Sequence, residues 1–192
     1  TGRSIYRVEG DVLVNGQVAG EHTVITANDK LQTGPDSQVI FAVGQDAFIL
    51  RAKSELHLTG PDGLIVHGLR VITGGLLSVF GQREHQIQTT QATIGIRGTG
   101  VYVEAEAERS YVCTCYGQVQ ITAQGAPEQN ETILSRHHDA PRYISGEGSR
   151  RIQPAPVINH TDAELALVEA LVQRTPPFSF TMPGRSGDGW HY

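Results

Sequence analysis

The chain has 192 residues, 39% of them hydrophobic, and a formal net charge of −5 at pH 7. That length suits one domain, or one domain with a short appendage, and is enough to bury a hydrophobic core. Lysine supplies only two of the 15 basic residues, and no basic stripe with interleaved aromatic residues occurs, which argues against a nucleic-acid partner. No run approaches the ~20 consecutive apolar residues of a transmembrane helix, and residues 1–6 lack the charged-then-apolar layout of a signal peptide.

Short β-strand patterns fill the first 145 residues. Asn15-Gly16 lies within alternating apolar and polar residues and predicts a hairpin with a type I′ turn, because that turn needs positive φ angles. Segments 38–43 and 46–50 flank Gly44-Gln45 and predict a second hairpin. Further strands are expected at 55–58, 64–72, 76–80, 86–89, 101–105, 111–116 and 119–123. Strands this short and closely spaced are typical of a rolled β-sandwich or a β-solenoid-like fold, so we expect an all-β domain over residues 1–145.

Residues 146–192 differ in character and predict a connector, one short α-helix and a tail. Thr161 can act as the N-cap and Glu164 follows three residues later, as in a capping box. Apolar residues then recur at helical spacing, which predicts a helix over about 162–174 that stops before Pro176. The narrow apolar face favours a lid docked on the β domain, and a partner-binding helix is the alternative.

Two motifs resemble the FecR family. Residues 29–34, Asp-Lys-Leu-Gln-Thr-Gly, resemble the family's early GD-x-[IL]-x-TG element, with Asn28 in place of the usual glycine. Residues 90–99, Thr-Gln-Ala-Thr-Ile-Gly-Ile-Arg-Gly-Thr, resemble its TP-x-A-x-[IV]-G-[VI]-RGT signature, with Gln91 in place of proline. The resemblance covers about residues 10–123.

That resemblance implies a bacterial domain outside the cytoplasmic membrane. In the best-known members it receives a signal from an outer-membrane receptor and relays it to a sigma factor. The relay needs a transmembrane helix and a cytoplasmic anti-sigma region, and these 192 residues contain the pattern of neither. We therefore carry over the domain and its location, and not the full regulatory mechanism.

The signature also has a physical interpretation. Gly95 and Gly98 flank Ile96-Arg97 and allow the backbone to turn or to approach a neighbour closely. The five donors of Arg97 can bind several carbonyls in such a setting, so we expect a structural clamp, with a ligand-binding arginine as the alternative.

Cys113 and Cys115 are the two cysteines, and their spacing places both side chains on one face of a predicted strand. Their Cα atoms would be roughly 6.5–7 Å apart, at the upper limit for a relaxed disulfide. Two thiolates on one face can instead hold one metal ion or an iron–sulfur cluster. A strained disulfide or redox-active dithiol, and buried structural thiols, stay open as alternatives.

Adjacent histidines follow about twenty residues later, at His137 and His138. Two cysteines and two histidines complete four ligands for zinc, for copper or for a [2Fe-2S] cluster with mixed ligation. Asp139 is a candidate acceptor that orients one imidazole. Both histidines can ligate only if the chain turns, because neighbours in a strand point to opposite faces. We expect His160 and His191 to be solvated surface groups, and Met182 is a weaker candidate as an axial copper ligand.

Motifs of the common enzyme classes are absent: GxSxG, HExxH, the P-loop, the Rossmann glycine fingerprint and CxxCH. We therefore expect no enzyme, and a reaction of Cys113 as a thiolate nucleophile is the one enzymatic alternative. The resemblance implies a periplasmic or otherwise extracytoplasmic binding or sensing module with an envelope protein partner, and the cysteines and histidines predict that it holds a Cys/His metal or iron–sulfur centre, which can be redox-active. The alternative is a metal-free protein–protein or cell-wall interaction scaffold in envelope signalling.

Overall fold

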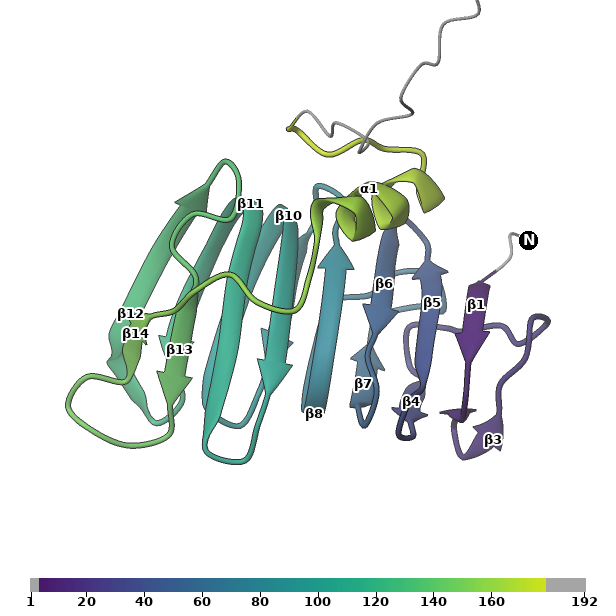
Figure 1. The fold of residues 1–192 in the computed structure, drawn as a ribbon, viewed down its shortest axis with the longest axis horizontal. Helices are drawn as coiled ribbons and strands as arrows, with labels where there is room; N and C mark the ends of the chain where they lie inside the picture. The colour runs from purple at the N-terminus through teal and green to yellow at the C-terminus, as the bar shows by residue number, and fades with distance from the viewer. Residues whose placement is uncertain (1–3, 179–192) are drawn as a thin grey trace, which may run out of the picture.

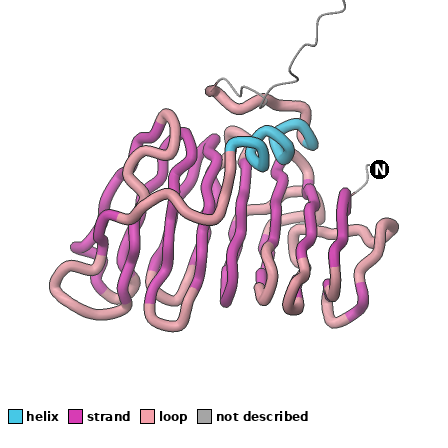
Figure 2. Tube along the Cα trace, viewed as in Figure 1, coloured by secondary structure: helices cyan, strands magenta, loops and turns pink. Residues whose placement is uncertain are grey.

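Strands in two facing layers make up most of the protein, and one short helix lies against the outside of one layer (Figures 1 and 2). The computed structural model describes residues 4–178. Over that range the elements are β1 (Ile5–Glu9), β2 (Val12–Val14), β3 (Gln17–Val18), β4 (Lys30–Thr33), β5 (Gln38–Val43), β6 (Asp46–Leu50), β7 (Glu55–Thr59), β8 (Gly68–Val79), β9 (Glu84–Gln88), β10 (Ala92–Ala105), β11 (Arg109–Ala123), β12 (Ala126–Ser135), β13 (Arg142–Ser145), β14 (Ile152–Pro154) and α1 (Asp162–Leu171).

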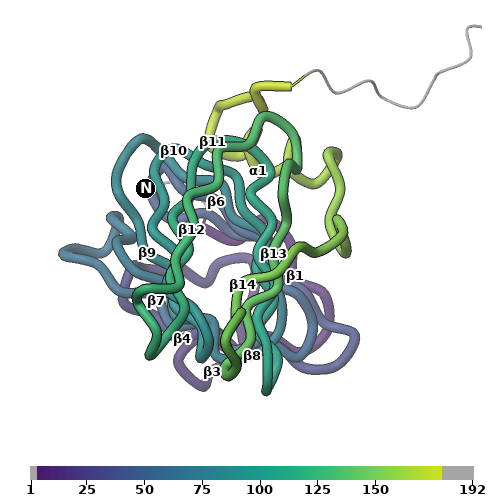
Figure 3. Tube along the Cα trace, turned by 90° about the vertical axis from the view of Figure 1, so that its left-hand side faces the viewer, coloured from purple at the N-terminus to yellow at the C-terminus, as the bar shows by residue number. Residues whose placement is uncertain are grey.

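Three long strands pass from one layer to the other and so roll a single sheet over its own core (Figure 3). The first half of β8 pairs with β7 and β9, and its second half pairs with β6 and β10. The first half of β10 pairs with β9 and its second half with β8. Likewise β11 pairs with β13 at its start and with β12 from Gly117 onward. All these pairs are antiparallel except β8 with β9.

The bends need glycine at two positions that matter for the site. Gly117 has φ 89, and a Cβ there would lie 2.8 Å from the Thr99 hydroxyl and 3.0 Å from the Gly98 carbonyl. Gly98 has φ 57 and lies at a register shift between β10 and β11. A residue with a side chain is strained in that left-handed region, so glycine is what lets these strands change layer.

One of the two layers packs against apolar residues on both of its faces. The layer formed by β1, β5, β6, β13, β14 and the adjoining halves of β8, β10 and β11 is called the helix-side layer below. Its inner face packs against the other layer and buries residues such as Val101 and Val103 in the main core. Its outer face forms a second apolar cluster, which includes Tyr102 and two residues of α1, Leu165 and Val168. Because side chains alternate along a strand, neighbouring residues lie in turn in the main core and in the outer apolar cluster.

Helix α1 begins as the sequence predicts and ends earlier. The Thr161 side chain accepts a hydrogen bond from the Glu164 amide, and the Glu164 carboxylate accepts one from the Thr161 amide, so the capping box is present. The expected end at 174 is wrong: the helix stops at Leu171, because the chain leaves helical geometry at Val172 and turns at Gln173 with φ 59. The helix docks on this protein's own sheet, as a lid does.

The expected all-β class with one short C-terminal helix is confirmed. Both predicted hairpins are present, and Asn15 and Gly16 have φ 52 and 78, as a type I′ turn requires. The segments expected at 111–116 and 119–123 are one continuous strand, β11. The sheet also continues past residue 145, because β14 pairs with β13. Within residues 4–178 no helix has the length and apolarity needed to span a membrane.

Candidate metal centre

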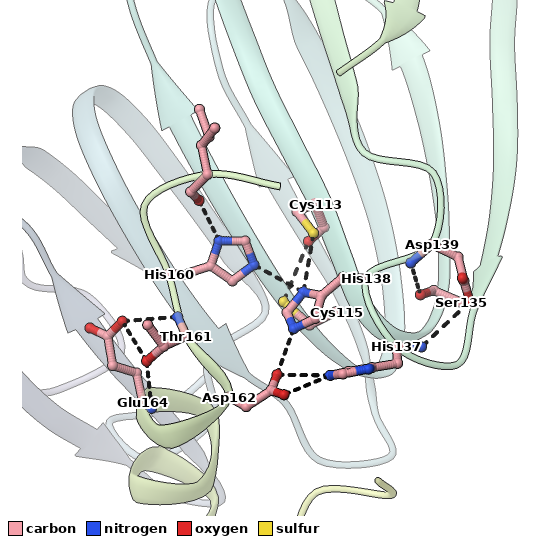
Figure 4. Close-up of polar contacts among 11 residues, drawn as sticks. Cys113, Cys115, Ser135, His137, His138, Asp139, His160, Thr161, Asp162 and Glu164 are labelled. Carbon is pink, nitrogen blue, oxygen red and sulfur yellow. Dashed lines mark hydrogen bonds and ion pairs between the residues drawn. The ribbon is translucent and has the colours of Figure 1, made fainter. Parts of the chain in front are cut away.

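Four potential metal ligands from three separate segments meet on the outer face of the helix-side layer (Figure 4). Cys113 and Cys115 lie on β11, His138 lies in the loop between β12 and β13, and His160 lies in the connector that leads to α1. One ligand atom from each residue lies within 4.8 Å of every other. We call these four residues the Cys/His cluster.

The two cysteines are placed by strand alternation. Cys113 and Cys115 are both free, both 0% exposed, and both belong to the outer apolar cluster, so they lie on one face of β11 as the spacing predicts. Between them, Thr114 belongs to the opposite face. Buried unpaired thiols on one face are well placed for a shared ion, because a metal ion requires convergent sulfur ligands.

A tight turn brings His138 over the cysteines. His138 has φ 55, and its amide donates to the Cys115 carbonyl at 2.8 Å. The carboxylate of Asp139 accepts from the amides of Arg136 and His137, at 2.9 and 3.4 Å, and so holds the turn. The expectation that Asp139 orients an imidazole is wrong, because its Oδ2 binds these backbone amides while the rings of His137 and His138 bind another carboxylate.

Asp162, the first residue of α1, has the role expected of Asp139. Its carboxylate lies 2.8 Å from Nε2 of His138 and 2.8 Å from Nε2 of His137. The side chain of His137 is 49% exposed and packs beside Phe178, with ring centroids 4.4 Å apart. His137 therefore lies beside the Cys/His cluster, in a more exposed group with His138 and Asp162.

His160 was expected to be a solvated surface group, and that expectation is wrong. It is 8% exposed, its ring stacks on Tyr102 with centroids 4.7 Å apart, and its Nδ1 lies 2.6 Å from the Ile158 carbonyl. A carbonyl oxygen only accepts hydrogen bonds, so Nδ1 carries the proton, and in the neutral ring Nε2 presents a lone pair. That lone pair faces Nδ1 of His138 at 3.1 Å.

The same reasoning gives the tautomer of the His138 imidazole. Asp162 accepts a hydrogen bond from Nε2 of His138, so Nδ1 of the neutral His138 ring also presents a lone pair. At 3.1 Å the two ring nitrogens can share a proton as a hydrogen bond or bind one metal ion between them. Either a proton or a metal ion satisfies both rings.

The distances suit a tetrahedral ion. With Zn–S bonds of about 2.3 Å and Zn–N bonds of about 2.05 Å, a tetrahedron has N···N edges of about 3.4 Å and S···N edges of about 3.6 Å. The His138 and His160 nitrogens are 3.1 Å apart, and Cys113 Sγ lies 3.5 Å from His138 Nδ1. These separations are within a few tenths of an ångström of the tetrahedral edges.

Electrostatics favour a thiolate at Cys113. A hydrogen bond from Cys115, helped by His138 and His160, lowers the pKa of Cys113 well below 9.0 against the opposing effect of burial. Burial raises the pKa of Cys115. Burial disfavours a charge on His138, but Cys113 and Asp162 outweigh it and raise the pKa of His138. A proton shared between thiolate and imidazole thus competes with any metal for this cluster.

Sequence reasoning found three of the four cluster residues: Cys113, Cys115 and His138. It missed His160. The expected docking of the helix on the sheet could have indicated this residue, because His160 directly precedes the N-cap and so lies on the face that carries Cys113 and Cys115. Met182 and His191 lie outside the described residues.

The signature residues lie elsewhere. Arg97 is exposed, and within residues 4–178 its guanidinium makes no hydrogen bond, so the expected structural clamp is wrong. Its position in β10, pointing away from both cores, explains why no carbonyl is within reach. With Gly95 it instead lines a surface pocket beside His67 and Glu84. Gly98 provides the bend described above.

Comparison with solved structures identifies a related fold. Two crystal structures of a "putative anti-sigma factor" from Parabacteroides distasonis ATCC 8503 align with TM-scores of 0.53 and 0.53, at 15% and 12% sequence identity. They cover 66% and 73% of this chain, and this chain spans 58% and 64% of their length. No family model matches the sequence, and no curated protein matches it. At these identities the likeness shows a shared fold.

Proposed function

We propose that this protein is an extracytoplasmic FecR-type binding or sensing module that holds one metal ion in the Cys/His cluster. The observation that carries the proposal is the convergence of four ligand atoms: the ring nitrogens of His138 and His160, 3.1 Å apart, and the buried sulfurs of Cys113 and Cys115, all within 4.8 Å of one another. Each ring is fixed in its ligating orientation by a second hydrogen bond, to the Ile158 carbonyl or to Asp162.

A single ion fits better than a two-iron cluster. In a [2Fe-2S] cluster with mixed ligation, cysteines bind one iron and histidines bind the other, so the cluster itself separates sulfur from nitrogen. Here Cys113 Sγ lies only 3.5 Å from His138 Nδ1. Two thiolates and two imidazoles suit zinc(II) or copper(I), with zinc favoured because four protein ligands are at hand and the two known nitrogen and sulfur separations lie close to tetrahedral edges.

The envelope assignment rests on two observations of different kinds. The motifs at residues 29–34 and 90–99 resemble the FecR family, and the fold resembles structures named as anti-sigma factors. The motif residues support the fold in this protein: Gly98, within the second motif, allows β10 to change layer. A protein partner in the bacterial envelope is the class of partner that this assignment implies.

Metal content is the direct test. The full chain is purified without added metal or chelator, then analysed for zinc, copper and iron per chain, with an absorption spectrum and a thiol titration. We expect about one equivalent of zinc or copper, and binding that is lost in Cys113→Ser and retained in the matched variant His137→Ala. Protein that binds neither metal when each is supplied would refute the metal centre and leave a metal-free interaction scaffold as the better account.

Thiol chemistry is a second candidate, favoured by one specific observation. Cys113, His138 and Asp162 form a thiol–imidazole–carboxylate chain, with Sγ to Nδ1 at 3.5 Å and Nε2 to the carboxylate at 2.8 Å. Such a chain can activate a nucleophile. Cys113 is 0% exposed, however, so a substrate reaches the sulfur only if the connector moves. Rapid alkylation of Cys113 in the native, metal-free protein would support this use over the metal centre.

A further inference from the structure

The C-terminal part of the described chain docks on the sheet by side-chain packing and hydrogen bonds. Residues 155–174, which we call the lid, comprise the connector and α1 and cross the outer face of the helix-side layer (Figure 1). Only four lid residues are buried: His160, Leu165, Val168 and Glu169. Two of these are apolar, and four partly buried apolar residues pack against the same outer cluster: Ala155, Ile158, Leu171 and Val172. A ten-residue helix is marginal alone, so its order depends on docking.

Polar contacts add to docking at both ends of α1. Arg51 donates to Glu164 at 2.5 Å and to the Asn159 carbonyl at 2.8 Å. Arg174 donates to Glu169 at 2.7 Å and to the Gln45 carbonyl at 2.6 Å. Arg51, Glu164 and Arg174 are partly exposed, so water competes for their contacts, whereas Glu169 is buried and also accepts a hydrogen bond from the Tyr116 hydroxyl. The lid is held largely by side-chain contacts, so it can open without breaking the strand pairing of the sheet.

The Cys/His cluster joins the lid to the sheet. Three ligands, Cys113, Cys115 and His138, belong to the β body, and the fourth, His160, belongs to the lid. Asp162, also in the lid, holds His138 in its ligating orientation. A bound ion is thus bonded to both parts at once, and the lid cannot leave without losing one ligand and the orientation of a second.

From this arrangement we infer that the metal ion is a clasp: its binding fixes the lid on the sheet and its loss releases the lid. The inference rests on the proposed metal centre and specifies how that centre is coupled to the rest of the fold. Release uncovers the outer apolar cluster beneath α1, which includes Ile49, Leu77 and Val79. Metal occupancy then sets how much apolar surface the protein exposes, which is the kind of change a sensing module needs.

Hydrogen–deuterium exchange on the full chain tests the clasp. Zinc(II) chloride is supplied at about 100 times its Kd, and binding suppresses an opening that breaks the site by up to about 100-fold. We expect amides of 160–172 to exchange faster by up to that factor without zinc, while amides of β5 and β6 stay unchanged. The factor is an upper limit, because three ligands remain in the open form.

Two variants make the test specific. His160→Ala removes the lid's ligand, so zinc at saturation should no longer slow lid exchange, whereas His137→Ala should respond as the native protein does. Arg51→Ala loosens the lid without touching a ligand, and because coupling is reciprocal it should weaken zinc binding. One zinc per chain with equal lid exchange in both states overturns the clasp and leaves the metal centre standing. A chain that binds no zinc overturns both.

Discussion

Asp162→Asn is the most informative single substitution, because it changes a charge without removing a ligand. Asp162 lies 2.8 Å from Nε2 of His138 and 2.8 Å from Nε2 of His137. The shared carboxylate orients the His138 ring and increases the basicity of its ligating nitrogen. The asparagine side chain can accept one of these hydrogen bonds, but it carries no charge.

Loss of such a partner lowers metal affinity by about 10–100-fold, or about 1.4–2.7 kcal/mol. The substitution also removes an acidic residue from the first turn of α1, which lowers helix stability by about 0.3–1 kcal/mol. The two effects separate experimentally: competition against a chromophoric zinc chelator gives the affinity, and thermal unfolding of the metal-free protein gives the helix contribution.

The matched control is Asp139→Asn, which changes a neighbouring carboxylate that binds only backbone amides of its own turn. We expect its zinc affinity to stay within about threefold of the native value, since no ligand depends on Asp139 directly. Equal affinities for the native protein and Asp162→Asn would refute the orienting role. A loss in Asp139→Asn as large as that in Asp162→Asn would show that turn geometry, and not the carboxylate of Asp162, controls the site.

Three further predictions follow from the geometry. Cys115→Ser should lower zinc affinity by at least about 100-fold, because a hydroxyl replaces a soft thiolate ligand, and the same chelator competition measures it. Burial opposes ionisation of Glu164, but the ion pair with Arg51 outweighs burial and lowers the pKa of Glu164 from 4.5. The ion pair therefore stabilises the fold above pH 4.5, and this stabilisation is lost as the pH falls through the lowered pKa. Unfolding followed from pH 6 to 3 should show the loss, and Glu164→Gln should abolish this pH dependence. Gly117→Ala should destabilise the fold by about 1–3 kcal/mol in urea unfolding, because alanine at φ 89 is strained and its Cβ would crowd β10. The control is Gly125→Ala, which should destabilise less, because Gly125 also has a positive φ of 74 but lies in open surroundings.

Local patterns predicted the fold class and the first hairpins because their signals lie within a few residues. Asn15-Gly16 needs only its own turn geometry, and Thr161 with Glu164 needs only one helical turn. The end of α1 was overestimated because Val172 continues the apolar pattern, while the turn at Gln173 leaves no local signature.

Strand β12 escaped prediction for a different reason. Its residues 127–131 are largely polar, and it is a strand only because β11 offers an edge to pair with. Pairing of this kind depends on residues distant in the sequence, so periodicity alone does not reveal it. Only 101–105 of β10 was predicted as a strand, and β11 was divided around Gly117, which marks a change of layer and not the end of a strand.

The candidate site was partly predictable, since the spacing of Cys113 and Cys115 determines that both sulfurs share a face. Which carboxylate orients His138 was not predictable, because Asp139 is adjacent in sequence whereas Asp162 arrives with the lid. His160 was missed for the same reason. Site residues on a docked segment can be identified only when the docking position of that segment is known, and local sequence patterns do not give that position.

The composition of the outer face argues that the cluster has a purpose beyond packing. Around it the face is filled by well-packed groups such as Tyr102 and Tyr111, and replacing buried polar groups by such residues is often neutral or stabilising. A thiolate, two imidazoles and a carboxylate gathered there are unfavourable to bury unless a cation compensates them. A shared proton joins two of these atoms, whereas one ion bound by Cys113, Cys115 and both rings satisfies every inward-facing atom together. That difference supports the proposed metal centre over packing of the lid alone as the reason for these residues.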